Sequence, residues 1–268
     1  MRKKLFFWLV FILMTIFLII LSYFSVRNII KNKIASKCMD DVYKFSKDNE
    51  ETVFSINKIV YYSSSNANAD INPNSSFTIS NLYQYTDIAI FINSNSDGNF
   101  TAKNTLKNVT LSDIKFNLTP SIGTPNLYYK NINDFATNKY DENNLVSDTL
   151  DFSISSEDEI DYSAPTLFNN SANPITLCYV NSDLKPNYTL PAGTSNISYD
   201  GKLLKDCNVT LNSIACKISF LITIVNNLDE TFTCPVILNI PLSTENETIY
   251  DGKLLLNDAT DYNFIKIN

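Results

Sequence analysis

The chain has 268 residues, with 28 acidic and 21 basic side chains and no histidine. The absence of histidine excludes Ser-His-Asp triads, Cys-His pairs and histidine-ligated metal sites. The net charge of -7 argues against binding to nucleic acid phosphates, and five glycines are too few for a glycine-rich phosphate loop. We therefore expect no nucleic acid partner and no cofactor.

The N-terminus carries a long uncharged run. Residues 1–4 are mostly basic, and residues 5–24 read LFFWLVFILMTIFLIILSYF, without a charge, a glycine or a proline. A helix of that length spans about 30 Å, the thickness of the hydrocarbon core of a bilayer. Trp8 and Tyr23 lie near its two ends, where aromatic side chains anchor a helix at the membrane interface. The run therefore predicts a transmembrane helix, with the lipid bilayer as a partner.

The sequence after the run does not look like a cleavage site. Ser25 and Val26 lead directly into Arg27, without the small-residue pattern that signal peptidase requires. We therefore expect an uncleaved signal anchor. Basic residues flank both ends of the run, so the orientation is inferred from the rest of the chain. Residues 1–60 carry ten basic and five acidic side chains, whereas residues 61–268 carry 11 basic and 23 acidic ones. We expect the tail in the cytoplasm and the acidic part outside the plasma membrane.

Residues 25–51 show a helical period. Val26, Ile30, Ile34 and Cys38 recur every four residues within a charged segment, which predicts an amphipathic helix. We favour a helix that continues out of the membrane and rests on the following domain. The alternatives are a helix in the lipid headgroup layer and a self-associating stalk. Cys38 is interpreted first as a packing residue and second as an intermolecular disulfide.

From residue 52 onward the hydrophobic period changes to two. The stretches 52–63, 89–93 and 109–118 are typical of strands. The clearest pattern is 216–242, where apolar residues alternate on both sides of a turn at 226–230, as in an antiparallel hairpin with one buried face. Short strands without a long helical period predict a mainly β fold, an antiparallel β-sandwich of Ig-like or jelly-roll type over 52–268.

Several turns refine this picture. Pro235 falls on the outward side of the second hairpin strand, which predicts a sheet edge or a bulge. The hexapeptide YDGKLL occurs at 199–204 and again at 250–255, and each Asp-Gly pair favours a tight hairpin. The alternative is that the two copies mark duplicated halves. The polar stretch 120–148 is a candidate linker or inserted loop, which leaves one domain or two subdomains open.

The cysteines of the β-patterned part suggest an exported protein. Cys178, Cys207, Cys216 and Cys234 form an even set, as expected of disulfides outside the cytoplasm. Residues 211–213 make a plausible turn between Cys207 and Cys216, so one pairing joins these two and leaves Cys178 with Cys234. The alternative is four buried free thiols. The spacing is not that of a zinc site, and no metal site is predicted.

Three patterns suggest chemistry but lack residues that it needs. The tetrapeptide TFTC at 231–234 superficially resembles the T-L-x-T-C motif of sortase transpeptidases. A thiolate there needs a basic partner, and Arg2 and Arg27, the only arginines, flank the apolar run. Residues 93–99 are similar to the start of an EF-hand calcium loop, but Asn104 stands where the bidentate Glu belongs. Carboxylates are plentiful, yet no pair is distinguished as the acid and base of a hydrolase.

The sequence thus predicts a single-pass, membrane-anchored cell-surface protein and no catalytic residues. The expected domains are the tail 1–4, the anchor 5–24, the juxtamembrane helix 25–51 and the ectodomain 52–268. A structural, adhesive or assembly role at the cell envelope is expected, with a protein or glycan at the cell surface as partner. The alternatives are a pilus- or pseudopilus-like subunit and an extracytoplasmic carboxylate-dependent hydrolase.

Overall fold

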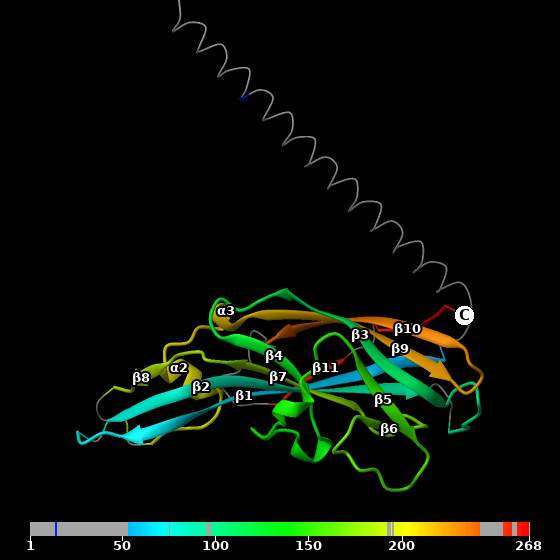
Figure 1. Cartoon of the computed structure of the whole chain (residues 1–268), viewed down its shortest axis with the longest axis horizontal. Coiled ribbons are helices and arrows are strands. Elements are labelled where there is room, and N and C mark those ends of the chain that lie inside the picture. Colours follow the sequence, from blue (N-terminus) through cyan, green and yellow to red (C-terminus); the bar gives the residue numbers. More distant parts are fainter. Residues whose placement is uncertain are drawn as a thin grey trace, which may run out of the picture. The chain divides into compact units, whose positions relative to one another are not determined.

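The structure is a computed structural model (Figure 1). It describes Met14 and residues 53–74, 76–94, 98–191, 194, 196–241, 254–258 and 262–267, with the backbone alone for 254–258. The chain divides into two units, Met1–Glu51 and Thr52–Asn268. All described residues except Met14 belong to the second unit.

The predictions for the first unit fall outside the described residues. They concern the tail 1–4, the apolar run 5–24 with its anchors Trp8 and Tyr23, and the helix 25–51. Met14, the one described residue of this unit, is helical and exposed. Within the described ranges, no helix combines the length and the apolar character that crossing a membrane requires.

The second unit is mainly β, as predicted, and is built from two sheets (Figure 1). The first sheet has the order β11-β1-β2-β7-β4, and β8 also pairs with β2. Its strands are β1 (Phe54–Ile71), β2 (Phe77–Ser94), β4 (Thr124–Tyr129), β7 (Ile175–Ser182), β8 (Asn187–Thr189) and β11 (Leu254–Asp258). All its pairings are antiparallel, and β1 and β2 run beside each other over nearly their whole length.

The second sheet has the order β12-β10-β9-β3-β5-β6. Its strands are β3 (Leu106–Leu118), β5 (Leu150–Ser155), β6 (Thr166–Phe168), β9 (Cys216–Asn226), β10 (Thr231–Ile240) and β12 (Ile265–Lys266). Because β5 and β6 pair in parallel, this sheet is mixed, whereas an antiparallel fold was expected. The described helices are short: η1 (Ile132–Asp134), η2 (Glu142–Asn144), α2 (Gly201–Asp206) and α3 (Leu211–Ile214).

The predicted hairpin over 216–242 is confirmed as β9 and β10. The two strands pair from Thr231 opposite Val225 to Ile240 opposite Cys216, and buried residues alternate along both. Pro235 points outward, and β12 pairs with β10 only before this proline. Its missing N–H donor therefore lies at an edge position, where it leaves the described ladder intact.

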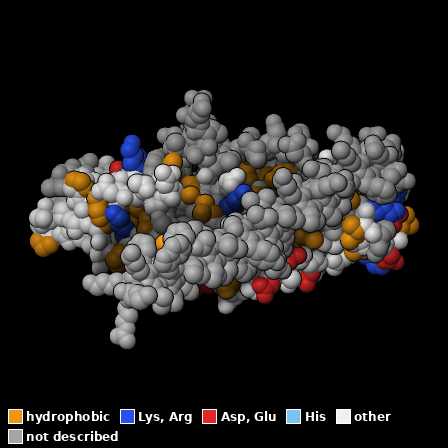
Figure 2. All heavy atoms as spheres, turned by 90° about the horizontal axis from the view of Figure 1, so that it is seen from above, with side chains coloured by type: hydrophobic (Ala, Val, Ile, Leu, Met, Phe, Trp, Pro, Cys, Tyr) orange, Lys and Arg blue, Asp and Glu red, His pale blue; other side chains and the backbone are white. Residues whose placement is uncertain are grey.

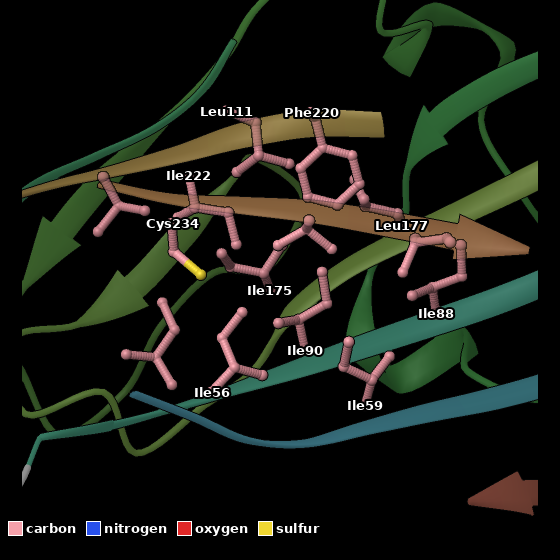
Figure 3. Close-up of a cluster of buried hydrophobic side chains, with 14 of the residues drawn as sticks. Ile56, Ile59, Ile88, Ile90, Leu111, Ile175, Leu177, Phe220, Ile222 and Cys234 are labelled. Carbon is pink, nitrogen blue, oxygen red and sulfur yellow. The ribbon is translucent and has the colours of Figure 1, made fainter. Parts of the chain in front are cut away.

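The facing sides of the two sheets share one hydrophobic cluster (Figure 3). Ile56, Ile59, Ile88 and Ile90 come from the first sheet, and Leu111, Phe220, Ile222 and Cys234 come from the second. Along β9 and β10 every second side chain enters this core, because successive side chains of a strand point to opposite faces.

One expectation about turns is wrong, and so is the alternative of duplicated halves. Asp200-Gly201 does not form a hairpin, because the Asp200 side chain accepts a hydrogen bond from the Lys202 N–H and caps α2. Leu203 of the same hexapeptide lies in α2, whereas Leu254 of the second copy lies in β11. The two copies therefore differ in structure, which contradicts duplicated halves. The second pair, Asp251-Gly252, lies outside the described residues.

The polar stretch 120–148 is not a linker or a loop without strands. It contains β4, whose residues from Thr124 to Tyr129 pair with β7 in the first sheet. Leu127 and Tyr129 reach the shared core, so this stretch contributes to the same hydrophobic cluster as the rest of the unit. The two 3₁₀-helices η1 and η2 follow β4 and complete the stretch.

Candidate functional site

The candidate site lies on the face of the first sheet that points away from the shared core. In register, Cys178 of β7 stands opposite Asp87 of β2 on one side and opposite Tyr128 of β4 on the other. Leu177 and Tyr179, which alternate with Cys178, lie in the shared core. Since alternate residues share a face, Asp87, Cys178 and Tyr128 all point outward together.

A buried ion pair forms the centre of this site. The Lys130 Nζ donates to both oxygens of Asp87 at 2.8 Å and to the backbone carbonyl of Thr137 at 2.7 Å. The Ala136 N–H donates to Asp87 Oδ2 at 2.8 Å. The two charged side chains are 1% and 0% exposed. Burial raises the pKa of the Asp87 carboxyl, and the Lys130 ammonium acts in the opposite direction.

The segment after β4 supplies two backbone groups that contact the ion pair. It folds back over the sheet through η1, so that Ala136 and Thr137 both reach the ion pair. Ala136 has φ 61°, in the left-handed region that a residue with a Cβ seldom adopts. Such a backbone costs about 1–2 kcal/mol and persists where the surrounding structure fixes it. The fold therefore holds a strained residue at the place where its N–H meets Asp87.

A group of tyrosine rings contacts the ion pair through Tyr85. The Tyr85 ring centroid lies 5.5 Å from Lys130 Nζ, within the range of a cation–π interaction. We call the rings the tyrosine cluster; its members are Tyr62, Tyr83, Tyr85, Tyr128 and Tyr140. Their contacts run from Tyr62–Tyr85 at 6.2 Å through Tyr83–Tyr140 at 6.3 Å to Tyr128–Tyr140 at 4.9 Å between ring centroids. Burial raises the pKa of Tyr140 to about 12, so its hydroxyl stays protonated at neutral pH.

The cysteines do not form the expected pairs. Cys178, Cys207, Cys216 and Cys234 are all free and buried. Cys178 packs against the tyrosine cluster, on the opposite face of β7 from the core that holds Cys234. Cys207 packs in a separate hydrophobic cluster beside α2, and α3 occupies the turn expected at 211–213. The alternative of four buried thiols describes this structure.

Burial also decides the chemistry of these thiols. It raises the pKa of Cys207 and Cys216 to about 11 and that of Cys234 to about 12, and it raises the pKa of Cys178 as well. A protonated thiol is a poor nucleophile. Cys234 is 1% exposed and faces the shared core, so the sulfur of the TFTC tetrapeptide is buried.

The calcium-like segment has a structural explanation where it is described. Asn104 accepts a hydrogen bond from Thr101 N and donates to Asn99 O, which closes a local turn. Residues 95–97 of that segment lie outside the described residues. Across the described part of the chain, no group of three or more Cys, Asp or Glu side chains is placed to hold a metal ion.

The carboxylates do not form a hydrolase pair at the candidate site. Asp87 is the only carboxylate that is buried among the described residues, and both of its oxygens accept hydrogen bonds from Lys130 or Ala136.

On the face drawn in Figure 2, lysines lie apart from one another among hydrophobic and acidic side chains rather than in one basic patch.

The sequence did not predict Asp87, Lys130 or the tyrosine cluster as a site. One local signal was present, since Asp87 interrupts a β-patterned stretch as a single charge among apolar and hydroxyl neighbours. Its partner Lys130 is 43 residues away in the stretch interpreted as a linker or inserted loop.

Comparisons with protein-family models, curated proteins and solved structures found no match to this chain.

Proposed function

We propose that this chain is a single-pass, membrane-anchored cell-surface protein with a structural, adhesive or assembly role at the cell envelope. The observation that carries the proposal is the order of two parts in one chain. The uncharged run 5–24 precedes a mainly β unit that begins at Thr52. A run of that length and composition favours insertion into a bilayer by several kcal/mol, at about -0.3 to -0.6 kcal/mol for each Leu, Ile, Phe or Val.

We further propose that the β unit is an extracytoplasmic β-sandwich of Ig-like or jelly-roll type. Two sheets that share one hydrophobic cluster support a sandwich. The side chains of Tyr62, Tyr83 and Tyr140 are half-buried at the rim of the tyrosine cluster. A tyrosine combines an apolar ring with a polar hydroxyl, which suits contact with a protein or a glycan at the cell surface.

A binding or structural role is favoured over catalysis by the state of the candidate site. A general acid or base needs a proton to exchange with a substrate. The Asp87 carboxylate is instead held by two contacts to Lys130 and one to the Ala136 N–H, with no exposed surface. This geometry ties the carboxylate to the protein itself.

Membrane fractionation tests the anchor. The full chain should sediment with membranes and remain there after washing at high salt and alkaline pH. Leu13→Arg with Ile16→Arg should release it, because an arginine near the centre of a spanning helix costs about 2.5–3.5 kcal/mol. The matched control, Leu13→Ile with Ile16→Leu, should stay membrane-bound. Release of the unmodified chain by the alkaline wash would overturn the proposal.

A further inference from the structure

The centre of the candidate site brings an amine and a carboxyl group together without solvent. Lys130 Nζ contacts both oxygens of Asp87 at 2.8 Å, and both side chains are almost completely buried. These are the two groups that an amide bond is made from. We propose that Asp87 and Lys130 join in an intramolecular amide cross-link, a covalent modification that goes beyond the proposed function and does not depend on it.

The reaction needs no external reagent. Transfer of one proton from the Lys130 ammonium to the Asp87 carboxylate gives a neutral amine and a neutral acid, at a place where neither side chain is solvated. The lone pair on Nζ then attacks Cγ and forms the C–N bond. A second proton passes from nitrogen to the departing oxygen, the C–O bond breaks, and one water leaves. The ammonium and carboxylate thus become one amide and one water, with no change in oxidation state.

The neighbouring groups assign a role to each oxygen. The Ala136 N–H donates to Oδ2, where it stabilises the negative charge that develops when Cγ becomes tetrahedral. Oδ2 therefore remains as the amide oxygen, and Oδ1 departs as water. The Thr137 carbonyl accepts a hydrogen bond from Nζ and orients the nitrogen. Ala136 and Thr137 act as positioning residues.

Cys178 supplies a polar hydrogen at the same place. It stands opposite Asp87 in register and is completely buried on the same face of the sheet. Because burial keeps its thiol protonated, Cys178 is suited to passing a proton toward the departing oxygen. The Tyr85 ring lies over Lys130, and the burial of both side chains keeps bulk water from reversing the reaction.

The cross-link would join parts of the sheet that are not neighbours. Asp87 lies on β2 and Lys130 directly follows β4, and β7 separates these two strands. The bond would span β7 and close a loop between residues 43 positions apart. Such a bond restricts the unfolded chain as a disulfide does, but reducing agents do not cleave it.

Intact-mass measurement of the denatured full chain tests the proposal. The cross-linked chain should be lighter than the sequence requires by one water, about 18 Da. Lys130→Met should show its full sequence mass. Lys139→Met is the matched control, because Lys139 is exposed a few residues away, and it should keep the loss.

Peptide mapping of the unmodified chain locates the loss even if Lys130→Met fails to fold. A peptide containing Asp87 should be joined to one containing Lys130, with no tryptic cleavage after Lys130. A full sequence mass for the folded, unmodified chain would overturn the proposal and leave an ordinary buried ion pair. A loss of water that maps to another residue would overturn it equally.

Discussion

Replacing Lys130 with methionine tests the energetics of the candidate site. Methionine keeps most of the side-chain volume but removes the side chain that contacts both oxygens of the buried Asp87 carboxyl, so the variant holds a free carboxyl there with neither an ion pair nor an amide. Removing one partner of a buried pair costs about 3–5 kcal/mol, because an uncompensated charge is left behind. We expect Lys130→Met to lower the free energy of unfolding by at least about 3 kcal/mol. Lys115→Met, at an exposed pair with Asp113, should change it by less than about 1 kcal/mol.

The pH dependence identifies the cause of this loss. Burial already raises the pKa of Asp87 from 3.8, and the variant loses the Lys130 charge that opposes this rise. The folded variant then binds a proton over a pH range in which the unfolded chain has released it. Its free energy of unfolding should therefore fall as pH rises from about 4 toward neutral.

Circular dichroism during urea unfolding is the suitable assay. Trp8 is the only tryptophan, so tryptophan fluorescence would not report on the β unit. The deficit of Lys130→Met relative to the unmodified chain should be larger at pH 7 than at pH 4. A deficit below about 3 kcal/mol at pH 7, or one that is equal at both pH values, would refute the role assigned to the pair.

Three further predictions concern the rest of the β unit. Leu238→Ala, at a side chain 1% exposed, should cost about 2–5 kcal/mol in urea unfolding, whereas Leu228→Ala, at one 54% exposed, should cost less than about 0.5 kcal/mol; equal costs would contradict the assigned core. Gly123→Ala should lower the melting temperature more than Gly98→Ala, because both glycines have positive φ but only at Gly123 would a Cβ clash with Asn181; the reverse order would contradict the packing. The four buried cysteines should react with iodoacetamide only after unfolding, as mass mapping would show, and rapid labelling of the folded chain would contradict their burial.

The fold was predictable where a local period determined it. The strands of the 216–242 hairpin bury alternate residues along their whole length, so the sequence alone specified the face and the turn. The Asp200-Gly201 pair shows the opposite case, because the same residues suit a hairpin turn and a helix cap. The helix is favoured here because it buries Leu203 and Leu204 in the hydrophobic cluster beside α2.

The candidate site was not predictable for a related reason. Asp87 and Lys130 meet only because β7 inserts between β2 and β4, and strand order across a sheet has no local signature. The sequence from 120 to 148 is polar and offers no clear alternation, so it predicts a linker or an inserted loop where the structure has β4 and Lys130. The cysteines follow the same rule. Their even count suggests pairing, but the fold places the two members of each expected pair in different clusters.

Labelling of lysines on intact cells tests the membrane topology most directly. An amine-reactive reagent that cannot cross membranes should modify Lys115, whose side chain is 66% exposed, while Lys3 and Lys4 stay unmodified until the cells are lysed. This result is expected if the β unit lies outside the membrane and the basic tail inside it. Modification of Lys3 and Lys4 on intact cells, with Lys115 reached only after lysis, would contradict the proposed surface protein.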